Sequence, residues 1–508
     1  MKDVIYVLDF GSQYSHLITR RIRELGVFAE LVPPNFGLSK LKEAKGIILS
    51  GGPQNLSDSK ALRVDKKIYN LGVPVLGICY GMQLTAFELG GKVKAGVHRE
   101  YGSTEVTIKK AEGIFQGLSR KQTTWMSHGD QVVKIPKGFV KTASSANCPV
   151  AGMEDAGKKI YCIQFHPEVV HTRNGTKILA NFIKICRVRR TWSMKDFVAR
   201  SITKIKKDVG KDKVICALSG GVDSSVAATM VHRAVGKNLT CIYVDTGLMR
   251  SGETEQLKKM FRNYLHMNFK IIHAEEQFLK KLKGITDPEK KRKTIGELFI
   301  RIFEKEARKL GKIKHLVQGT LYTDAVTSGV SIGGKHTASI KSHHNVGGLP
   351  EKMNLKLIEP LRELYKDEVR QIGRMLGLHR SVTERQPFPG PSLAVRIIGE
   401  VTKERADTLR QADAIVCEEV EKSGIKIQQY FAVLPSMRSV GVQGDARTYG
   451  HPIIIRALTS KELLTVDWAR LPHELLAKIS TRITNEVKGI NRVVYDITSK
   501  PPGTVEWE

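Results

Sequence analysis

Residues 73–91, VPVLGICYGMQLTAFELGG, join an apolar run to a helix-forming run through a cysteine that has a glycine on either side. The run VPVLGI has the length and composition of a strand buried on both faces, and MQLTAFEL suits a helix. A short buried strand followed at once by a helix is typical of a βαβ unit in a parallel sheet. Cys79 would then occupy the sharp turn between the two elements.

The same alternation of apolar and helical runs occurs along most of the chain. Two successive parts of the chain show apolar runs that alternate with helical runs. After Gln386 the pattern changes: a proline-rich segment is followed by apolar runs typical of strands and by two helical runs. We therefore predict an α/β protein in which two doubly wound, mostly parallel-sheet domains, 1–187 and 188–385, precede a small α+β C-terminal domain, 386–508. The apolar runs on which this rests are 4–10, 45–52, 73–78, 158–165, 213–221, 239–247 and 315–320, and for the last domain 427–435, 451–458 and 490–498. The lysine-rich segment 279–293 between them is expected to be a surface loop.

Composition narrows the class of protein. With 508 residues, 41% hydrophobic and 26% charged, the chain is typical of a multidomain globular protein, and no apolar run approaches the ~20 residues that cross a bilayer. Asp3 and Asp9 flank the first strand, which argues against a signal peptide. Seven cysteines form no CxxC pair, so neither a zinc ribbon nor a disulfide framework is expected. The cytoplasm is the expected compartment, and no membrane partner is expected.

The net charge of +31 suits a nucleic-acid partner, attraction of small anionic substrates, or simply a solvated lysine-rich surface. The basic runs at 187–200 and 290–293 are not interleaved with aromatic residues, which make up 6% of the chain. This pattern argues against a sequence-specific nucleic-acid site and favours anionic small molecules.

The sequence allows two interpretations of Cys79, a catalytic nucleophile or a buried structural residue, because free cysteines are often simply buried. A helix N-terminus lowers the pKa of a thiol, and the flanking glycines would permit a strained turn at a nucleophile. A nucleophile also needs a base and a group that orients it. QFHPE at 164–168 supplies His166 and Glu168 after a strand, and SGGP at 50–53 offers backbone N–H groups for an oxyanion.

GICYGMQ together with QFHPEV resembles the class I glutamine amidotransferases, which free ammonia from glutamine. The resemblance implies that Cys79 is the nucleophile, His166 the base and Glu168 the orienting carboxylate. It further places Gly52 and the Tyr80 amide in the oxyanion hole. The residues that it implies for glutamine binding are Gln83, Ser127, His128 and Asp130.

ALSGGVDSS at 217–225 is glycine-rich between an apolar run and a helical run, so its N–H groups and hydroxyls suit an anion. No Gly-Lys-Ser/Thr follows, which excludes a Walker A loop. The string SGGVDS resembles the pyrophosphate loop of N-type ATP pyrophosphatases, and VDTG around Asp245 resembles their adenine-contacting strand end. Mg²⁺ is expected as the companion of ATP and pyrophosphate. The implied ATP-binding residues are Ser219, Gly220, Gly221, Val222, Asp223, Ser224, Ser225 and Val244.

Over nearly its whole length the chain is similar to the glutamine-hydrolysing GMP synthase family, with matching segments such as LDFGSQY, WMSHGD, DTGLMR, IKSHHNVGGLPE and a long C-terminal run. The family converts XMP to GMP with glutamine and ATP, and its C-terminal domain forms a homodimer. The resemblance implies XMP-binding residues Arg292, Gln443, Lys500, Thr504, Val505 and Glu506. For a lid over the ATP site it implies Asp324, Thr327, Lys341, His343 and His344.

Three positions depart from the family pattern. Thr323 replaces a proline, Thr327 a glutamate and Ser392 a glycine. Loss of a carboxylate at Thr327 would slow the reaction by roughly 10²–10⁴-fold if that group transferred a proton. The departures leave three readings open: GMP synthesis, amidation of a related purine nucleotide, or a weakened enzyme with a nucleic-acid-binding or scaffold role.

Overall fold

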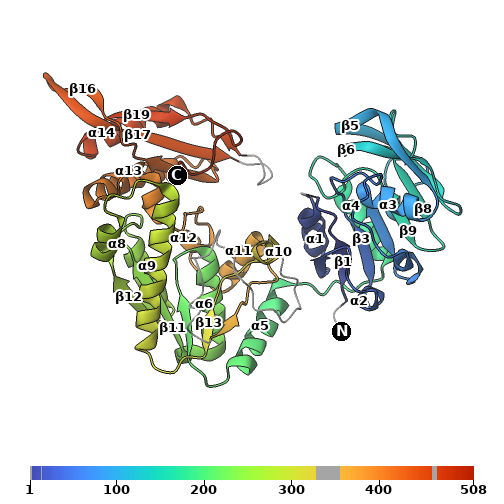
Figure 1. Cartoon of the computed structure of the whole chain (residues 1–508), viewed down its shortest axis with the longest axis horizontal. Coiled ribbons are helices and arrows are strands. Elements are labelled where there is room, and N and C mark those ends of the chain that lie inside the picture. Colours follow the sequence, from blue (N-terminus) through green and yellow to red (C-terminus); the bar gives the residue numbers. More distant parts are fainter. Residues whose placement is uncertain (1–2, 13, 328–354, 460–465) are drawn as a thin grey trace. The chain divides into compact units, whose positions relative to one another are not determined.

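The computed structural model describes all residues except 1–2, 13, 328–354 and 460–465 (Figure 1). The predicted lid residues Lys341, His343 and His344 therefore lie outside the described residues. The chain forms two compact units, Met1–Ser193 and Met194–Glu508, and each is described separately. Within the described residues, no helix is both long enough and apolar enough to cross a membrane.

The first unit is built on a nine-stranded sheet in the order β2-β1-β3-β4-β9-β8-β7-β5-β6. Strands β2, β1, β3, β4 and β9 are parallel, as predicted, and β3 and β4 are buried along their whole length. Helices α1 and α4 pack beside each other along this sheet. The strands are β1 (Ile5–Leu8), β2 (Ala29–Val32), β3 (Gly46–Leu49), β4 (Val75–Ile78), β5 (Lys92–Ile108), β6 (Lys121–Lys134), β7 (Val140–Ser144), β8 (Gly152–Asp155) and β9 (Ile160–Ile163). The helices are α1 (Ser15–Glu24), α2 (Leu38–Lys42), η1 (Lys66–Asn70), α3 (Tyr80–Glu88), η2 (Gly113–Phe115) and α4 (Gly175–Ile185).

The other half of this sheet, β8-β7-β5-β6, is antiparallel and is not indicated by the apolar runs. Strand β6 alternates between buried and more exposed positions over much of its length. Antiparallel strands with one solvated face carry such alternating polar residues and lack a continuous apolar signal. This half contributes the segment Ser127–Asp130 to the candidate site described below.

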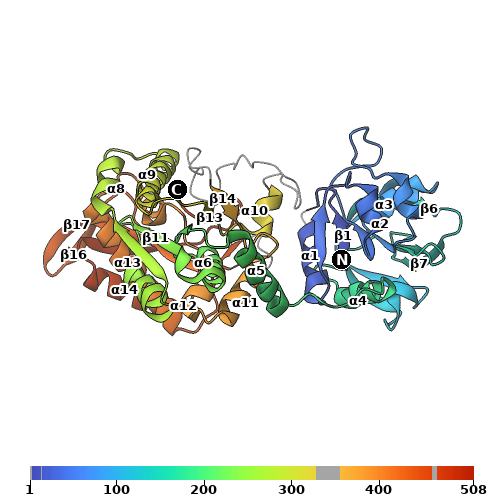
Figure 2. The same cartoon turned by 90° about the horizontal axis from the view of Figure 1, so that it is seen from below.

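The second unit begins with a five-stranded, wholly parallel sheet in the order β12-β11-β10-β13-β14, which confirms the second parallel sheet (Figure 2). Its strands are β10 (Val214–Ala217), β11 (Leu239–Asp245), β12 (Asn268–His273), β13 (His315–Val317) and β14 (Lys356–Ile358). Its helices are α5 (Met194–Val209), α6 (Val222–Val235), η3 (Gly236–Asn238), α7 (Glu253–Leu257), η4 (Lys258–Tyr264), α8 (Glu275–Leu282), α9 (Pro288–Arg308), α10 (Tyr322–Thr327), α11 (Lys366–Met375), α12 (Arg380–Thr383) and η5 (Ser392–Arg396).

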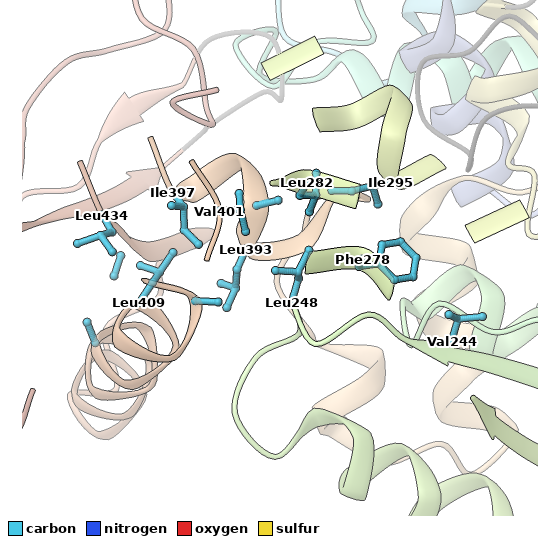
Figure 3. Close-up of a cluster of buried hydrophobic side chains, with 14 of the residues drawn as sticks. Val244, Leu248, Phe278, Leu282, Ile295, Leu393, Ile397, Val401, Leu409 and Leu434 are labelled. Atoms are coloured by element: carbon cyan, nitrogen blue, oxygen red, sulfur yellow. The ribbon is translucent and has the colours of Figure 1, made fainter. Parts of the chain in front are cut away.

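The C-terminal part adds a small sheet in which β17 is central and pairs with β15, β16, β18 and β19. Strands and helices here are α13 (Lys403–Lys422), β15 (Gln429–Val433), β16 (Ser439–Gln443), β17 (Ala446–Thr459), β18 (Asp467–Trp468), α14 (His473–Glu486) and β19 (Ile490–Asp496). One buried core continues from the parallel sheet into this part (Figure 3). Labelled members of this core are Val244, Leu248, Phe278, Leu282, Ile295, Leu393, Ile397, Val401, Leu409 and Leu434.

The expectation of a surface loop over 279–293 is wrong. Most of this segment lies in helices α8 and α9. The Asp287 carboxylate accepts a hydrogen bond from the Lys290 backbone N–H at 2.8 Å, and Pro288 follows at the first helical position, so the start of α9 is capped. Lys291 is buried and its ammonium pairs with Glu508, near the end of the chain. Lys291 can be buried in the packed helix because its ammonium has Glu508 and the Ile397 carbonyl as partners, whereas Lys290 and Lys293 stay exposed.

Ser392, one of the departures from the family pattern, is buried and adopts a φ of 59°. A side chain in this left-handed region costs about 1–2 kcal/mol, whereas glycine enters it without that penalty. We expect Ser392→Gly to raise the free energy of unfolding by about 0.5–1 kcal/mol, after allowance for the greater chain entropy of glycine. Chemical denaturation measures this change.

Ser392→Ala is the matched control because it removes the hydroxyl, which lies 3.3 Å from the Met249 sulfur, and keeps the strained backbone. Equal stabilisation by both variants would show that the hydroxyl, and not the backbone, carries the cost.

Candidate active site

Cys79 stands at the turn from β4 into α3, as the sequence predicts. Its backbone has φ 52° and ψ −105°, and its side chain is 5% exposed. A Cβ on Gly81 would lie 2.3 Å from the Leu49 carbonyl oxygen, and one on Gly77 would lie 2.8 Å from that of Gly81. Both glycines are therefore required by close packing of the turn, which presents the thiol at the N-terminus of α3.

His166 and Glu168 lie beside this turn. His166 follows β9, its N–H donates to the Trp125 carbonyl at 3.0 Å, and its Nδ1 lies 2.7 Å from Glu168 Oε1. All three side chains, Cys79 included, are buried. Burial alone would lower the pKa of His166, but the Glu168 carboxylate and a hydrogen bond with the Cys79 thiol raise that pKa well above its ordinary value. The arrangement favours the imidazolium form of His166 next to the sulfur of the candidate nucleophile.

Gly52 and Tyr80 are neighbours at the edge of the same turn. A Cβ on Gly52 would lie 2.8 Å from the Phe10 carbonyl oxygen and 3.3 Å from Tyr80 Cγ. Tyr80 is the first residue of α3, and the N–H of the following Gly81 donates to the Ser50 carbonyl at 3.1 Å. The SGGP turn is thereby held against the N-terminus of α3, where two N–H groups can converge on a developing oxyanion.

The segment proposed to hold glutamine lies against Cys79. The thiol donates to the Ser127 carbonyl at 3.7 Å, and the Gln83 side-chain amide donates to the Asp130 carbonyl at 2.8 Å. The side chain of His128 does not turn toward the thiol. Its two ring nitrogens engage Glu100 and the Asp130 carbonyl.

Among the residues that contact the candidate triad and were not named from the sequence, two approach the thiol and the imidazole ring themselves. The Gln164 side-chain amide lies 3.6 Å from the Cys79 sulfur, and the Tyr14 ring meets the His166 ring edge-on with centroids 5.3 Å apart. Both lie in segments that match the family, QFHPE and LDFGSQY. In the sequence, the match of these segments to the family is the signal that points to Gln164 and Tyr14. The fold is needed to show that their side chains reach Cys79 and His166.

The second site is the turn from β10 into α6. Gly220 adopts φ 77°, and Gly221 caps the helix. The exposed Ser219 hydroxyl lies 3.0 Å from the Ser224 hydroxyl, so both lie at the mouth of the loop. Arg385 donates to the Gly220 carbonyl at 2.9 Å and so helps to hold the loop in place. The backbone N–H groups and hydroxyls gathered at a helix N-terminus suit a pyrophosphate group.

Asp223 lies in the first turn of α6. Burial raises the pKa of its carboxyl group, and the Lys366 ammonium, 2.5 Å from Oδ2, acts in the opposite direction. Its Oδ1 is buried without a hydrogen-bond partner within the described residues. At the end of β11, the strand next to β10, Val244 is buried, and Asp245 accepts a hydrogen bond from the Thr254 hydroxyl at 2.9 Å. Ser225 and Val222 are buried in α6.

The residues assigned to a lid are only partly described. The Asp324 carboxylate accepts from the Leu321 N–H at 3.0 Å at the start of α10. Thr327 is the last residue of α10, and its side chain lies outside the described residues, as does that of Gln443 at the end of β16. Thr323 is exposed in the first turn of α10.

The C-terminal tail is fixed by buried cations. Arg396, fully buried, holds both carboxylate oxygens of Glu506 at 2.9 Å, and Arg456 donates to the Thr504 carbonyl at 2.7 Å and the Val505 carbonyl at 3.4 Å. The Lys500 backbone pairs with Val466. The guanidinium of Arg292 on α9 hydrogen-bonds to the Glu508 carbonyl. Arg292 is thus brought next to the tail that the resemblance assigns to XMP.

Three known families match successive parts of the chain, in the order of the domains expected from the sequence. Residues 6–186 match glutamine amidotransferase class-I, residues 193–321 match NAD synthase, and residues 418–507 match the GMP synthase C terminal domain. A GMP synthase [glutamine-hydrolyzing] from Clostridium botulinum is 54% identical over 512 residues, covering 100% of both chains. One from Carboxydothermus hydrogenoformans is 55% identical over 513 residues, again covering 100% of both.

The chain belongs to the glutamine-hydrolysing GMP synthase family. Among solved structures it is also similar to a glutamine amidotransferase from Thermotoga maritima, with 18% identity and a TM-score of 0.31, covering 38% of this chain and 100% of that chain. As a GMP synthase relative, it carries the cysteine turn in the part that matches class I amidotransferases and the SGGVDS loop in the part that matches NAD synthase. Both candidate sites therefore lie in segments that match families of the expected chemistry.

The buried Glu168 gives a testable prediction for this member of the GMP synthase family. Because the Glu168 carboxylate raises the pKa of His166, Glu168→Gln removes that negative charge and should lower the pKa of His166. The imidazolium of His166, which favours negative charge on a neighbouring sulfur, is then less populated at neutral pH. We expect the rate of Cys79 alkylation by iodoacetamide at pH 6–7 to decrease by about 10-fold or more, which corresponds to one pKa unit.

The alkylation rate measured from pH 5 to 10 provides the check. The thiolate of the variant should appear at a higher pH than that of the wild type. A pH profile that coincides with the wild-type profile would contradict the assigned role of Glu168.

Proposed function

We propose that this chain is a glutamine-dependent GMP synthase, which uses ATP to convert XMP to GMP. The observation that carries the proposal is the presence of a buried Cys79–His166–Glu168 triad and an SGGVDS loop on one chain whose whole length matches glutamine-hydrolysing GMP synthases. The triad supplies ammonia and the loop holds ATP.

At the first site, the Cys79 thiolate attacks the side-chain amide carbon of glutamine, and the oxyanion that forms is stabilised by N–H groups at Gly52 and Tyr80. The imidazolium of His166 protonates the departing nitrogen, so ammonia leaves and a thioester remains. His166 then deprotonates water, which hydrolyses the thioester to glutamate. Glu168 holds the imidazole through its Nδ1, as the 2.7 Å contact indicates.

At the second site, the oxygen on the XMP carbon that will receive the amino group attacks the α-phosphorus of ATP, and pyrophosphate leaves. Ammonia then adds to that carbon and displaces AMP, which leaves the amino group of GMP. The loop N–H groups and the hydroxyls of Ser219 and Ser224 are placed to bind the departing pyrophosphate. Each GMP therefore consumes one ATP and one glutamine.

The residues at the loop fit the Mg²⁺ that accompanies ATP. Asp223 offers a buried carboxylate oxygen without a hydrogen-bond partner within the described part of the chain, and oxygen is the ligand that Mg²⁺ prefers. Bound there, the ion would neutralise negative charge on the pyrophosphate. Asp223 is the residue that would hold it.

The acceptor is tested by steady-state synthesis with ATP, Mg²⁺ and glutamine, comparing XMP with IMP and other purine monophosphates. We expect turnover with XMP only, and loss of GMP formation when a chelator removes the metal. Turnover with another nucleotide in place of XMP would favour the related-purine reading, which the threonine at 327 keeps open. Turnover with none, together with salt-dependent binding of DNA or RNA, would favour the scaffold reading.

We further propose that the chain forms a homodimer through its C-terminal part, as its family does. The hairpin of β16 and the start of β17 projects from the second unit (Figure 1) and exposes large apolar side chains. Val442 is 76% exposed and Tyr449 is 65% exposed, which is costly for an isolated monomer surface. Sedimentation of the wild type should give the dimer, and Val442→Asp should shift the population to monomer. A wild-type monomer at micromolar concentration would contradict the proposal.

A further inference from the structure

Glu100 and His128 form a buried pair that the proposed chemistry does not use. Glu100 and His128 are each 5% exposed, and His128 Nε2 lies 3.1 Å from Glu100 Oε2. The Ser145 hydroxyl donates to the other carboxylate oxygen at 2.7 Å. Burying a carboxylate and an imidazole together is expensive unless their hydrogen bonds are satisfied, and here both groups have partners.

The backbone around this pair is not held by a continuous strand ladder. Strands β5 and β6 pair in register from Glu100 opposite His128 up to Thr107 opposite Lys121, but the register shifts between Ala95 and Glu100. The segment 127–130 therefore lies next to a break in the sheet. A buried side-chain pair directly across the two strands fixes the register where the backbone ladder does not.

The pair holds one carbonyl group of the candidate glutamine-binding segment, that of Asp130. His128 Nδ1 lies 3.0 Å from the Asp130 carbonyl oxygen, which also accepts from the Gln83 amide at 2.8 Å. The Ser127 carbonyl accepts from the Cys79 thiol at 3.7 Å. Two donors thus clamp one end of the segment, and the nucleophile contacts the other end.

We propose that Glu100 and His128 are positioning residues that fix the segment Ser127–Asp130 and thereby set the affinity of the site for glutamine. This inference rests on the proposed glutaminase function. The hydrogen bonds of the two side chains go to each other, to Ser145 and to the Asp130 carbonyl, so we expect them to act on substrate placement and to leave the reactivity of the nucleophile unchanged. His128 is in this reading a support for the glutamine-binding segment and not itself a glutamine ligand.

The hydrogen-bond geometry also identifies the conservative substitution. Burial lowers the pKa of His128, which favours the neutral ring. With Nδ1 donating to the Asp130 carbonyl, Nε2 of the neutral ring is an acceptor that faces residue 100. The amide of glutamine supplies an N–H at that place and can still accept from Ser145. Glu100→Gln should therefore preserve the pair, whereas Glu100→Ala removes the partner of Nε2.

The test compares glutamine hydrolysis by Glu100→Ala, His128→Ala, the double variant and Glu100→Gln. We expect each alanine variant to raise the KM for glutamine by about 10- to 100-fold with kcat within about threefold, since a misplacement of about 1 Å has effects of this size. The double variant should be no worse than either single variant, because the residues act as one unit. Glu100→Gln should remain within about threefold of the wild type.

Glu105→Ala is the matched control, since Glu105 forms an exposed ion pair with Lys121 across the same two strands at 2.9 Å. It should leave the KM for glutamine unchanged. Alkylation of Cys79 by iodoacetamide and ammonium-dependent GMP synthesis should be unchanged in all variants.

An unchanged KM in Glu100→Ala would overturn the inference. A fall in Cys79 alkylation that matches the fall in glutamine hydrolysis would also overturn it, because the pair would then only support the fold. Failure of the wild type to hydrolyse glutamine would instead refute the proposed function, on which the inference depends.

Discussion

Cys79→Ala is expected to lose glutamine-dependent GMP formation by about 10⁴-fold or more, because removal of a covalent nucleophile has effects of this size. Synthesis supported by ammonium salts should remain near the wild-type rate. The physical reason is that the thiol serves only to liberate ammonia, and externally supplied ammonia replaces its product. The two rates are measured as GMP formed with saturating XMP and ATP, with glutamine or ammonium chloride as the nitrogen source.

Cys162→Ala is the matched control for loss of a buried thiol. Cys162 lies in β9 and is fully buried, and burial raises the pKa of its thiol to about 12, so it stays protonated. This variant should retain both activities. Loss of ammonium-dependent synthesis in Cys79→Ala would refute the separation of the two chemistries.

Gly220→Ala is expected to reduce GMP synthesis by about 100-fold with either nitrogen source, the size of effect that follows from misplaced binding groups. Gly220 has a φ of 77°, and a Cβ there would lie 2.8 Å from the Leu257 side chain and 3.1 Å from Glu253 Oε1. Glu253 pairs with Arg385 at 2.7 Å, and Arg385 also holds the Gly220 carbonyl. The substitution would therefore shift the loop N–H groups away from the pyrophosphate. Alkylation of Cys79, which depends on the other site, should not change.

Gly236→Ala is the control for Gly220→Ala, because it introduces backbone strain without displacing the phosphate-binding loop. Gly236 follows the same helix, α6, with a φ of 55°, and a Cβ there would have no atom within 4 Å. It should cost about 1 kcal/mol of stability and leave synthesis intact. Equal loss of synthesis in both glycine variants would contradict the role given to the loop.

Some parts of this molecule follow directly from the sequence. The apolar runs predict the parallel strands because strands buried on both faces are almost continuously hydrophobic. The turn at Cys79 follows from Gly77 and Gly81, whose missing side chains are required by contacts with neighbouring backbone. The triad follows because His166 comes after a strand that lies next to β4 in the sheet.

Other parts depend on contacts that no local pattern shows. Glu100 and His128 are 28 residues apart and meet across an irregular antiparallel ladder, so neither residue alone predicts a buried pair. The lysine-rich segment 279–293 has the composition of a solvated loop, although Asp287 and Pro288 are a helix start signal. Burial of Lys291 depends on Glu508, 217 residues away. Only the folded chain brings these partners together.

The central claim is that nitrogen from glutamine, released at Cys79, becomes the amino group of GMP. The most direct measurement incubates the purified chain with XMP, ATP, Mg²⁺ and glutamine labelled with ¹⁵N in its side-chain amide, and follows the product by mass spectrometry. We expect GMP that is one mass unit heavier, formed together with AMP and pyrophosphate in equal amounts. Unlabelled GMP, or release of labelled ammonia with XMP left unchanged, would contradict the claim.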